Sequence, residues 1–175
     1  MAEPIDWHNL AIQLGTLSPN SESGGSDYAI RAIQLLLGED QLRAAVDYCV
    51  QGQPGSELAR SVLWHLHPWS AMQRCYEIYR SAESLGDRAY AVNLLNVVAD
   101  RRALPWISGF LDDPDPDIQA WGVGVLDQLL WSGLIEIEEC ADLLEKARQH
   151  PHPEVRKSAA FIDGYLKMRQ SSKET

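Results

Sequence analysis

Three aspartates near the middle of the chain have the spacing of a calcium-binding loop. Asp113, Asp115 and Asp117 would occupy the first, third and fifth positions of such a loop. The remaining positions do not fit, because the sixth is Ile118 instead of glycine and the twelfth is Gly124 instead of glutamate. Two prolines also stiffen the segment. We therefore interpret it as a turn that caps a helix and presents a solvated acidic face.

The histidines offer two pairs, His65 with His67 and His150 with His152. Side chains two residues apart on a helix point to different sides, so neither pair places two metal ligands on one face. None of the five histidines is followed by a glutamate, so histidine–glutamate metal-binding pairs are missing as well. The sequence therefore predicts a protein without a bound metal.

The sequence shows no clear catalytic nucleophile and no phosphate-binding loop. Cys49, Cys75 and Cys140 are far apart and lie in apolar stretches, which is typical of reduced, buried thiols. None carries the local signature of a catalytic cysteine. Gly24 and Gly25 are followed by Ser-Asp, without the lysine of a phosphate-binding loop. We expect neither catalysis nor a cofactor.

The charge balance excludes other classes of partner. The 175 residues include 25 acidic and 15 basic side chains, which gives a net charge of -10. This surplus repels phosphate groups, so neither nucleic acid nor an anionic membrane surface is expected as a partner. No apolar run approaches the ~18 residues of a membrane span, and the N-terminus lacks a secretory signal. We expect a cytoplasmic protein.

The elements that position these residues are predicted to be helices. Apolar residues recur every three or four positions, as at Ile118, Gly122, Val125 and Leu129, and alternating strand patterns are nearly absent. The expected helices are 5–16, 27–37, 39–51, 56–67, 69–84, 87–100, 102–112, 116–132, 136–148 and 153–167. Short connections predict that they form about five antiparallel hairpins. We expect one domain over residues 1–167, with a flexible loop at 18–27 and a disordered tail at 168–175.

A sequence repeat relates the last two hairpins. Residues 113–119 (DPDPDIQ) align with residues 150–156 (HPHPEVR) at a shift of 37. The apolar positions 118, 122, 125 and 129 then fall on 155, 159, 162 and 166. Weaker copies at 57–63 and 87–93 indicate a period of roughly 30 to 37 residues.

This pattern of an apolar helix, a proline-rich turn, Val155-Arg156 and an alanine-rich helix resembles the HEAT repeat. It is most similar to the variant named after phycobilisome lyases. The resemblance is strong over residues 102–167 and faint over 27–101. Gln119 departs from the family, which usually has arginine there, so we expect an incomplete side-chain ladder between repeats. The resemblance implies an all-α fold, a short right-handed α-solenoid of about five antiparallel helical hairpins.

In solenoids of this type, the second helix of each hairpin lines the concave wall. A rotation of 100° per residue turns Asp127 and Trp131 away from the apolar stripe of residues 116–132. Extended through the repeat, the candidate partner-binding residues are Arg60, Trp64, His67, Asn93, Asn96, Asp113, Asp115, Asp127, Trp131, Lys157 and Phe161. The aromatic members are typical of interaction hot spots, and Asp113 and Asp115 would form an acidic rim. Alternatively, these aromatic side chains pack between neighbouring hairpins.

These observations favour a non-catalytic protein-interaction module. The expected partner is a protein with a basic surface. This chain would act as an acidic inhibitor, an immunity-type protein or an adaptor, and we expect it to be monomeric on its own. The family resemblance suggests an alternative, a subunit of a phycobilin lyase or a chaperone-like factor for tetrapyrroles. No set of catalytic residues supports that alternative.

Overall fold

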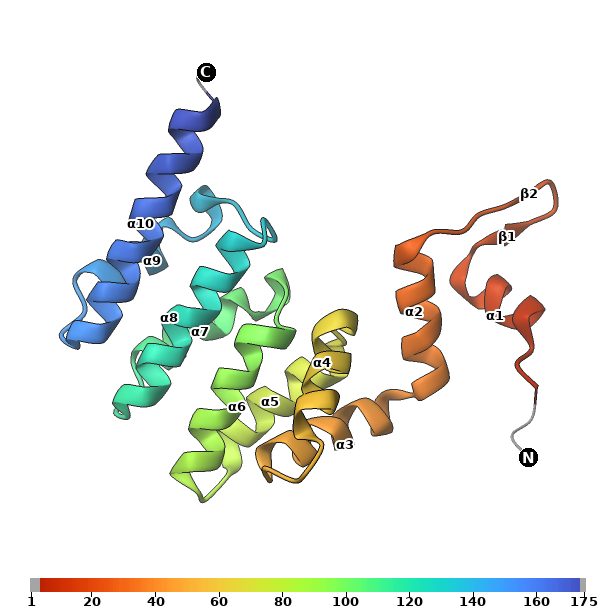
Figure 1. Cartoon of the computed structure of the whole chain (residues 1–175), viewed down its shortest axis with the longest axis horizontal. Coiled ribbons are helices and arrows are strands. Elements are labelled where there is room, and N and C mark those ends of the chain that lie inside the picture. The colour runs from red at the N-terminus through yellow and green to blue at the C-terminus, as the bar shows by residue number, and fades with distance from the viewer. Residues whose placement is uncertain (1–3, 174–175) are drawn as a thin grey trace.

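The computed structural model describes residues 4–173 and is predominantly helical (Figure 1). Its α-helices are α1 (Trp7–Leu14), α2 (Ser26–Leu37), α3 (Glu39–Val50), α4 (Ser56–Leu66), α5 (Trp69–Ser81), α6 (Leu85–Val98), α7 (Leu104–Leu111), α8 (Pro116–Trp131), α9 (Ala141–Arg148) and α10 (Pro153–Lys173). Short 3-10 helices, η1 (Arg101–Ala103) and η2 (Ile137–Glu139), precede α7 and α9. Two short strands, β1 (Leu17–Ser18) and β2 (Ser21–Glu22), pair antiparallel. The predicted all-α class is confirmed.

The proline-rich turn before α8 shows how the sequence sets a helix start. The Asp115 carboxylate accepts hydrogen bonds from the backbone N–H groups of Asp117 and Ile118, both at 3.0 Å. Pro116 occupies the first turn, where its missing N–H costs no helical hydrogen bond. The predicted capping turn is therefore present.

The structure differs from the sequence prediction at three boundaries. Residues 168–173, expected to belong to a disordered tail at 168–175, are part of α10, which continues to Lys173; residues 174 and 175 lie outside the described residues. No glycine or proline follows Gly164, and Arg169 Nη1 donates to the Leu130 carbonyl at 3.3 Å. The loop expected at 18–27 contains part of the β1–β2 pair. The helix expected at 136–148 is divided into η2 and α9 at Cys140.

Residues from α3 onward form the body of the protein, in which consecutive helices contact each other as α3–α4, α5–α6, α7–α8 and α9–α10. Within it, α4 contacts α6, α6 contacts α8, and α8 contacts α10. These even-numbered helices lie side by side in Figure 1. On the other side of the body, α3 contacts α5, and α7 contacts α9.

A continuous hydrophobic core joins the helices of the body. It runs from Leu42 in α3 to Tyr165 in α10. The predicted apolar stripes 118/122/125/129 and 155/159/162 are all buried, whereas Leu166 is half-buried. The segment before α3, which we call the arm, contains α1, β1, β2 and α2 and stands to one side of the body (Figure 1). From the arm, the half-buried Ile30 packs against the core.

Candidate protein interface

The row of even-numbered helices carries most of the predicted partner-binding residues. Of these residues, Arg60 and Trp64 lie in α4, Asn93 and Asn96 in α6, Asp127 and Trp131 in α8, and Lys157 and Phe161 in α10. Because these four helices contact one another in sequence, the structure places residues from distant parts of the chain in one row. The other three predicted residues, His67, Asp113 and Asp115, lie at helix ends.

Two exposed aromatic rings meet a buried tyrosine where α8 contacts α10. The Trp131 ring lies edge-on to Tyr165, with centroids 5.3 Å apart and an interplanar angle of 86°. Phe161 contacts the same tyrosine at 6.2 Å. Trp131 is 64% exposed and Phe161 is 63% exposed, whereas Tyr165 is 3% exposed. Each ring contacts Tyr165 and leaves most of its surface to solvent, so neither is buried between hairpins.

Among the residues that the structure describes, two buried polar atoms beside these rings lack a hydrogen-bond partner. Asp127 lies one helical turn before Trp131, and its Oδ1 is buried without a partner. The Tyr165 hydroxyl is also buried without a partner. Burial raises the pKa of Asp127, and burial together with the negative charge of Asp127 raises the pKa of Tyr165 to about 12. Buried polar atoms are normally paired, so both groups retain unused hydrogen-bonding capacity.

The surface of α10 is open next to Phe161. Gly164 lies one turn after Phe161, and a Cβ at this position would meet no atom within 4 Å. In the 37-residue repeat, Gly164 takes the place of Asp127. The missing side chain therefore leaves free space on the part of α10 that carries Phe161. We call Trp131, Phe161, Tyr165, Asp127 and Gly164 the aromatic site.

The α6 members of the predicted surface are held against α8. A Cβ at Gly124 would approach Asn96 Oδ1 to 2.6 Å, so the Asn96 side chain lies close against α8 and would have to move for a larger residue. The Asn96 amide donates to the Asn93 carbonyl at 3.2 Å. Both asparagines are half-buried. They serve the contact between α6 and α8 more than an exposed binding surface.

At α4, the predicted residues are divided between surface and structure. Trp64 is 51% exposed, and its ring lies 5.0 Å from that of His65. Arg60 is half-buried on the same helix. His67 ends α4 in a left-handed conformation with φ of 43°, and its Nδ1 lies 3.2 Å from the Val98 carbonyl. His67 therefore links α4 to the end of α6.

Asp113 does not form the acidic rim that the sequence suggests. It is 5% exposed, and its Oδ2 accepts hydrogen bonds from Arg88 at 2.8 Å and from the Tyr79 hydroxyl at 3.1 Å. Its Oδ1 accepts from the Asp115 N–H at 3.0 Å. Its partners come from α5 and α6, so Asp113 joins the turn to the preceding helix pair. Asp115 caps α8 through its Oδ1 and is half-exposed, so of the two aspartates only Asp113 is buried in an ion pair.

The same turn recurs at His150, which is also buried. Its Nδ1 accepts from the His152 N–H at 3.1 Å, and its Nε2 donates to the Leu111 carbonyl at 2.9 Å. Gln119 and Arg156 each donate to the carbonyl six residues earlier in the chain, both at 2.7 Å. The two turns that the sequence repeat aligns therefore also share the same pattern of hydrogen bonds. Gln119 takes the backbone contact that Arg156 makes in the next turn.

The cysteines are poor nucleophiles in this environment. Cys49, Cys75 and Cys140 are free and buried. Burial raises the pKa of each thiol, that of Cys140 to about 11. Only a small fraction is thiolate at neutral pH, and the thiolate is the reactive form. Among the described residues, no three His, Cys, Asp or Glu side chains are grouped closely enough to hold a metal ion.

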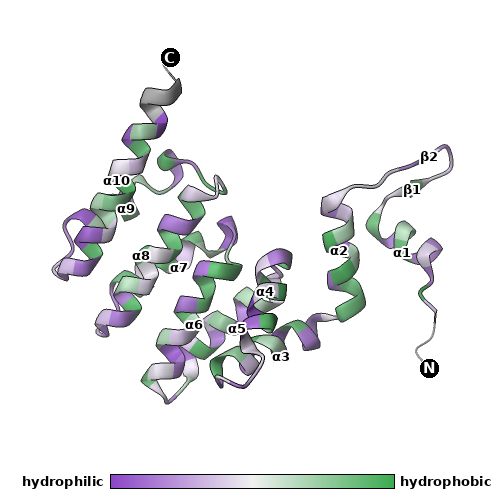
Figure 2. Ribbon diagram, viewed as in Figure 1, coloured by the Kyte–Doolittle hydropathy of each residue, from purple (hydrophilic) through white to green (hydrophobic). Residues whose placement is uncertain are grey.

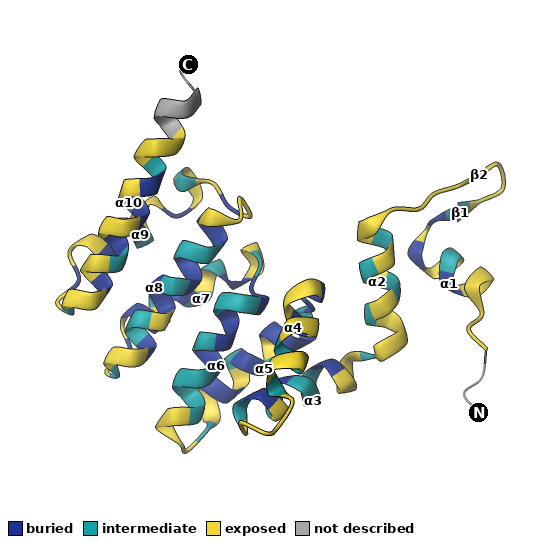
Figure 3. Ribbon diagram, in the orientation of Figure 1, coloured by how far each residue is buried: buried dark blue, intermediate teal, exposed yellow. Residues whose placement is uncertain are grey.

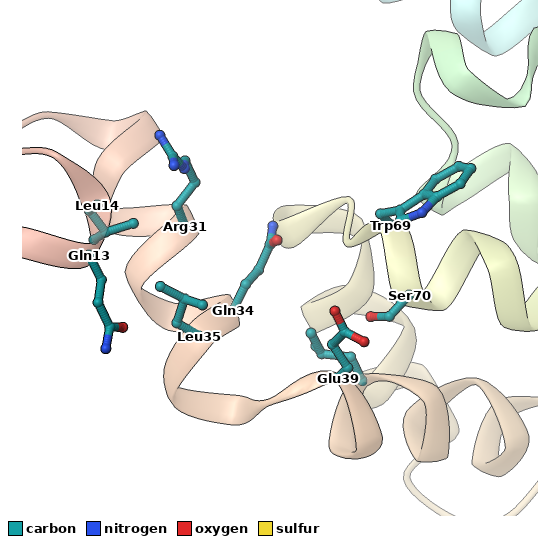
Figure 4. A pocket seen from close by; sticks show the side chains of 9 residues that line it. Gln13, Leu14, Arg31, Gln34, Leu35, Glu39, Trp69 and Ser70 are labelled. Carbon is teal, nitrogen blue, oxygen red and sulfur yellow. The ribbon is translucent and has the colours of Figure 1, made fainter. Parts of the chain in front are cut away.

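A hollow of about 320 Å³ separates the arm from the body (Figure 4). Gln13, Leu14, Arg31, Gln34 and Leu35 line it from the arm, and Glu39, Leu42, Trp69 and Ser70 line it from the body. Gln34 crosses the gap to donate to the Leu66 carbonyl at 2.5 Å. The residues that line this hollow belong to four helices and share no local motif, so the sequence does not predict it.

Comparison with known proteins adds no relative. No family model, no curated protein and no solved structure matches the chain. Within residues 4–173, no helix has both the length and the apolar character needed to cross a membrane. The case for a function therefore depends on the residues and contacts of this chain.

Proposed function

We propose that this protein is a non-catalytic interaction module, a short right-handed HEAT-like solenoid that binds a basic protein through its even-numbered helices. The helix pairs of the body and the repeated hydrogen bonds of the Asp113 and His150 turns support this architecture. In this arrangement α4, α6, α8 and α10 form the concave wall. The three free, buried thiols are suited to the reducing cytoplasm, where we place the protein.

The observation that carries the proposal is the pair of exposed aromatic rings on the buried Tyr165. Large aromatic side chains with few rotatable bonds lose little entropy when a partner covers them. Trp131 and Phe161 are held by a common neighbour, which restricts their motion further. A partner that covers both rings gains apolar burial on a surface that is already organised.

The overall charge of the protein favours a basic partner. The protein has a net charge of -10, so long-range attraction speeds the approach of a basic surface. A lysine or arginine side chain placed over Trp131 would gain a cation–π contact. Asp127, one helical turn before Trp131, would add a nearby carboxylate. The open space at Gly164 gives such a side chain room to enter.

Among modules of this kind, an inhibitor, an immunity-type protein or an adaptor fits best, because the surface offers binding without reactive groups. No contact in the described residues favours a tetrapyrrole over a protein. The alternative of a phycobilin-lyase subunit is therefore left to experiment. An absorbance change on adding a bilin would support it and would count against a purely protein-binding role.

Site-specific photocrosslinking in the source cell tests the proposal. A photoreactive phenylalanine analogue replaces Trp131 in one variant and Trp7, in the arm, in a matched control; both tryptophans are 64% exposed. We expect the probe at position 131 to capture a basic protein that the probe at position 7 does not capture. Capture of the same protein only from position 7, or of no protein from position 131, would contradict the proposed site.

A further inference from the structure

Helix α2 is apolar yet has no buried residue along its twelve positions. Figure 2 shows much of this helix as hydrophobic, and Figure 3 shows it as half-buried or exposed throughout. Ile33, Leu36 and Leu37 are 45%, 46% and 41% exposed. Ala29 is exposed as well. Such a helix has an apolar face that no described part of its own chain buries.

Helical geometry places these exposed residues on one stripe. Ala29, Ile33, Leu36 and Leu37 have the i, i+4, i+7 and i+8 spacing of a helix that packs against another helix. A neighbouring side of α2 faces the body, since Ile30 packs against the core of the body and Gln34 bonds to the end of α4. We call these four residues the α2 stripe. It contains no charged residue.

Two exposed side chains at the start of the chain extend the α2 stripe. Ile5 lines a hollow with Leu36, and Trp7 lines another with Ala29. Taking roughly 150–250 Å² for a fully exposed large apolar side chain, the exposed parts of these residues and the stripe amount to about 500 Å². A standard interface covers ~800 Å² on each partner, somewhat more than half of it apolar. The patch therefore supplies about the apolar area that one side of a stable dimer needs.

We propose that a second copy of this chain covers the α2 stripe, with the two α2 helices packed antiparallel across a twofold axis. A twofold interface must be self-complementary. Ala29 and Leu37 lie four residues on either side of Ile33, so an axis through Ile33 places the small residue of one copy against the large residue of the other. An uncharged stripe is suited to a copy of itself and offers nothing to a basic partner.

This dimer is independent of the proposed function, because the α2 stripe and the aromatic site share no residue. It replaces the expectation, from the sequence, of a monomer. The two associations also respond oppositely to salt. Salt screens the repulsion between two copies of net charge -10 and strengthens the dimer, whereas it weakens attraction to a basic partner.

Sedimentation of the full chain tests the dimer directly. We expect the wild type to be largely dimeric at about 100 µM, since interfaces of this area have micromolar or tighter affinity. Ile33→Glu places a charge on the axis and should give a monomer with an unchanged circular dichroism spectrum. Leu85→Glu is the matched control, because Leu85 is 49% exposed on α6, and it should remain dimeric.

A cross-link provides a second measurement. Under mild oxidation, Ile33→Cys should form an intermolecular disulfide with its own copy, whereas Leu85→Cys should not. A wild type that stays monomeric at about 100 µM, without the Ile33→Cys cross-link, would overturn the proposal. A dimer that survives Ile33→Glu would overturn it too, since the interface would then lie elsewhere. The proposal would also be contradicted if a different protein, and not a second copy of this chain, covered the α2 stripe.

Discussion

The arm and the body both contain helices rich in apolar residues, yet they differ in what covers those helices. In the body, Val92, Leu95, Ile118 and Leu129 are completely buried in one core. In the arm, α2 leaves Ile33, Leu36 and Leu37 more than two-fifths exposed. An apolar period therefore predicts a helix, but only the arrangement of helices decides whether its stripe faces a core or a partner.

The largest expected effect is a difference in stability between a core substitution in the body and a substitution in the arm. Leu129→Ala leaves a cavity in the core and should reduce the free energy of unfolding by ~2–5 kcal/mol. Leu36→Ala removes a side chain that the isolated chain leaves half-exposed and should cost less than ~0.5 kcal/mol. Urea unfolding at a protein concentration low enough to keep the chain monomeric measures both. Similar losses for the two variants would mean that α2 is packed as firmly as α8.

A second contrast concerns two helix glycines within the body. A Cβ at Gly122 would lie 2.5 Å from the Cβ of Phe110, so Gly122→Ala should force α7 and α8 apart and cost ~1–3 kcal/mol. Gly164 faces open space, so Gly164→Ala should stabilise α10 by ~0.5–1 kcal/mol. Thermal unfolding of both variants should therefore shift in opposite directions. A stabilising Gly122→Ala would show that α7 and α8 are not in close contact.

The smallest effect concerns pH and the buried carboxylate of Asp127. Burial raises the pKa of Asp127 in the folded state above its unfolded value, so ionisation costs stability as pH rises through that range. Asp127→Asn removes this cost and should be more stabilising at neutral pH than at acidic pH. Chemical unfolding of both proteins at a series of pH values measures the difference. A constant difference across the acidic range would show that Asp127 is not desolvated.

The sequence predicts much of the body because its information is local. The stripe at 118, 122, 125 and 129 follows from helical period alone, and the turn before α8 follows from capping chemistry. The exposure of Trp131 also follows from rotation about the helix. The prediction for Asp113 fails because its partner Arg88 lies 25 residues earlier in the chain. No local pattern identifies that ion pair.

The arm was harder to predict for the same reason. Trp7 has an apolar side chain in a helical segment, which usually indicates packing, but the structure leaves it 64% exposed. The sequence also does not predict that the Tyr165 hydroxyl is buried without a hydrogen-bond partner, because its burial depends on the contact between α8 and α10. The 37-residue repeat was the one available signal for that contact, since it aligns Gly164 with Asp127.

One binding measurement tests the proposed function most directly. It compares how tightly two tryptophan variants bind the partner that the photocrosslinking experiment captures. Trp131 and Trp7 are equally exposed but lie on the body and the arm. By isothermal titration calorimetry at fixed salt, Trp131→Ala should weaken binding by ~2 kcal/mol or more, about 30-fold, and Trp7→Ala should leave it unchanged. Both variants should unfold as the wild type does when monomeric. Unchanged affinity for Trp131→Ala, with loss of binding for Trp7→Ala, would contradict the account and place the protein interface on the arm.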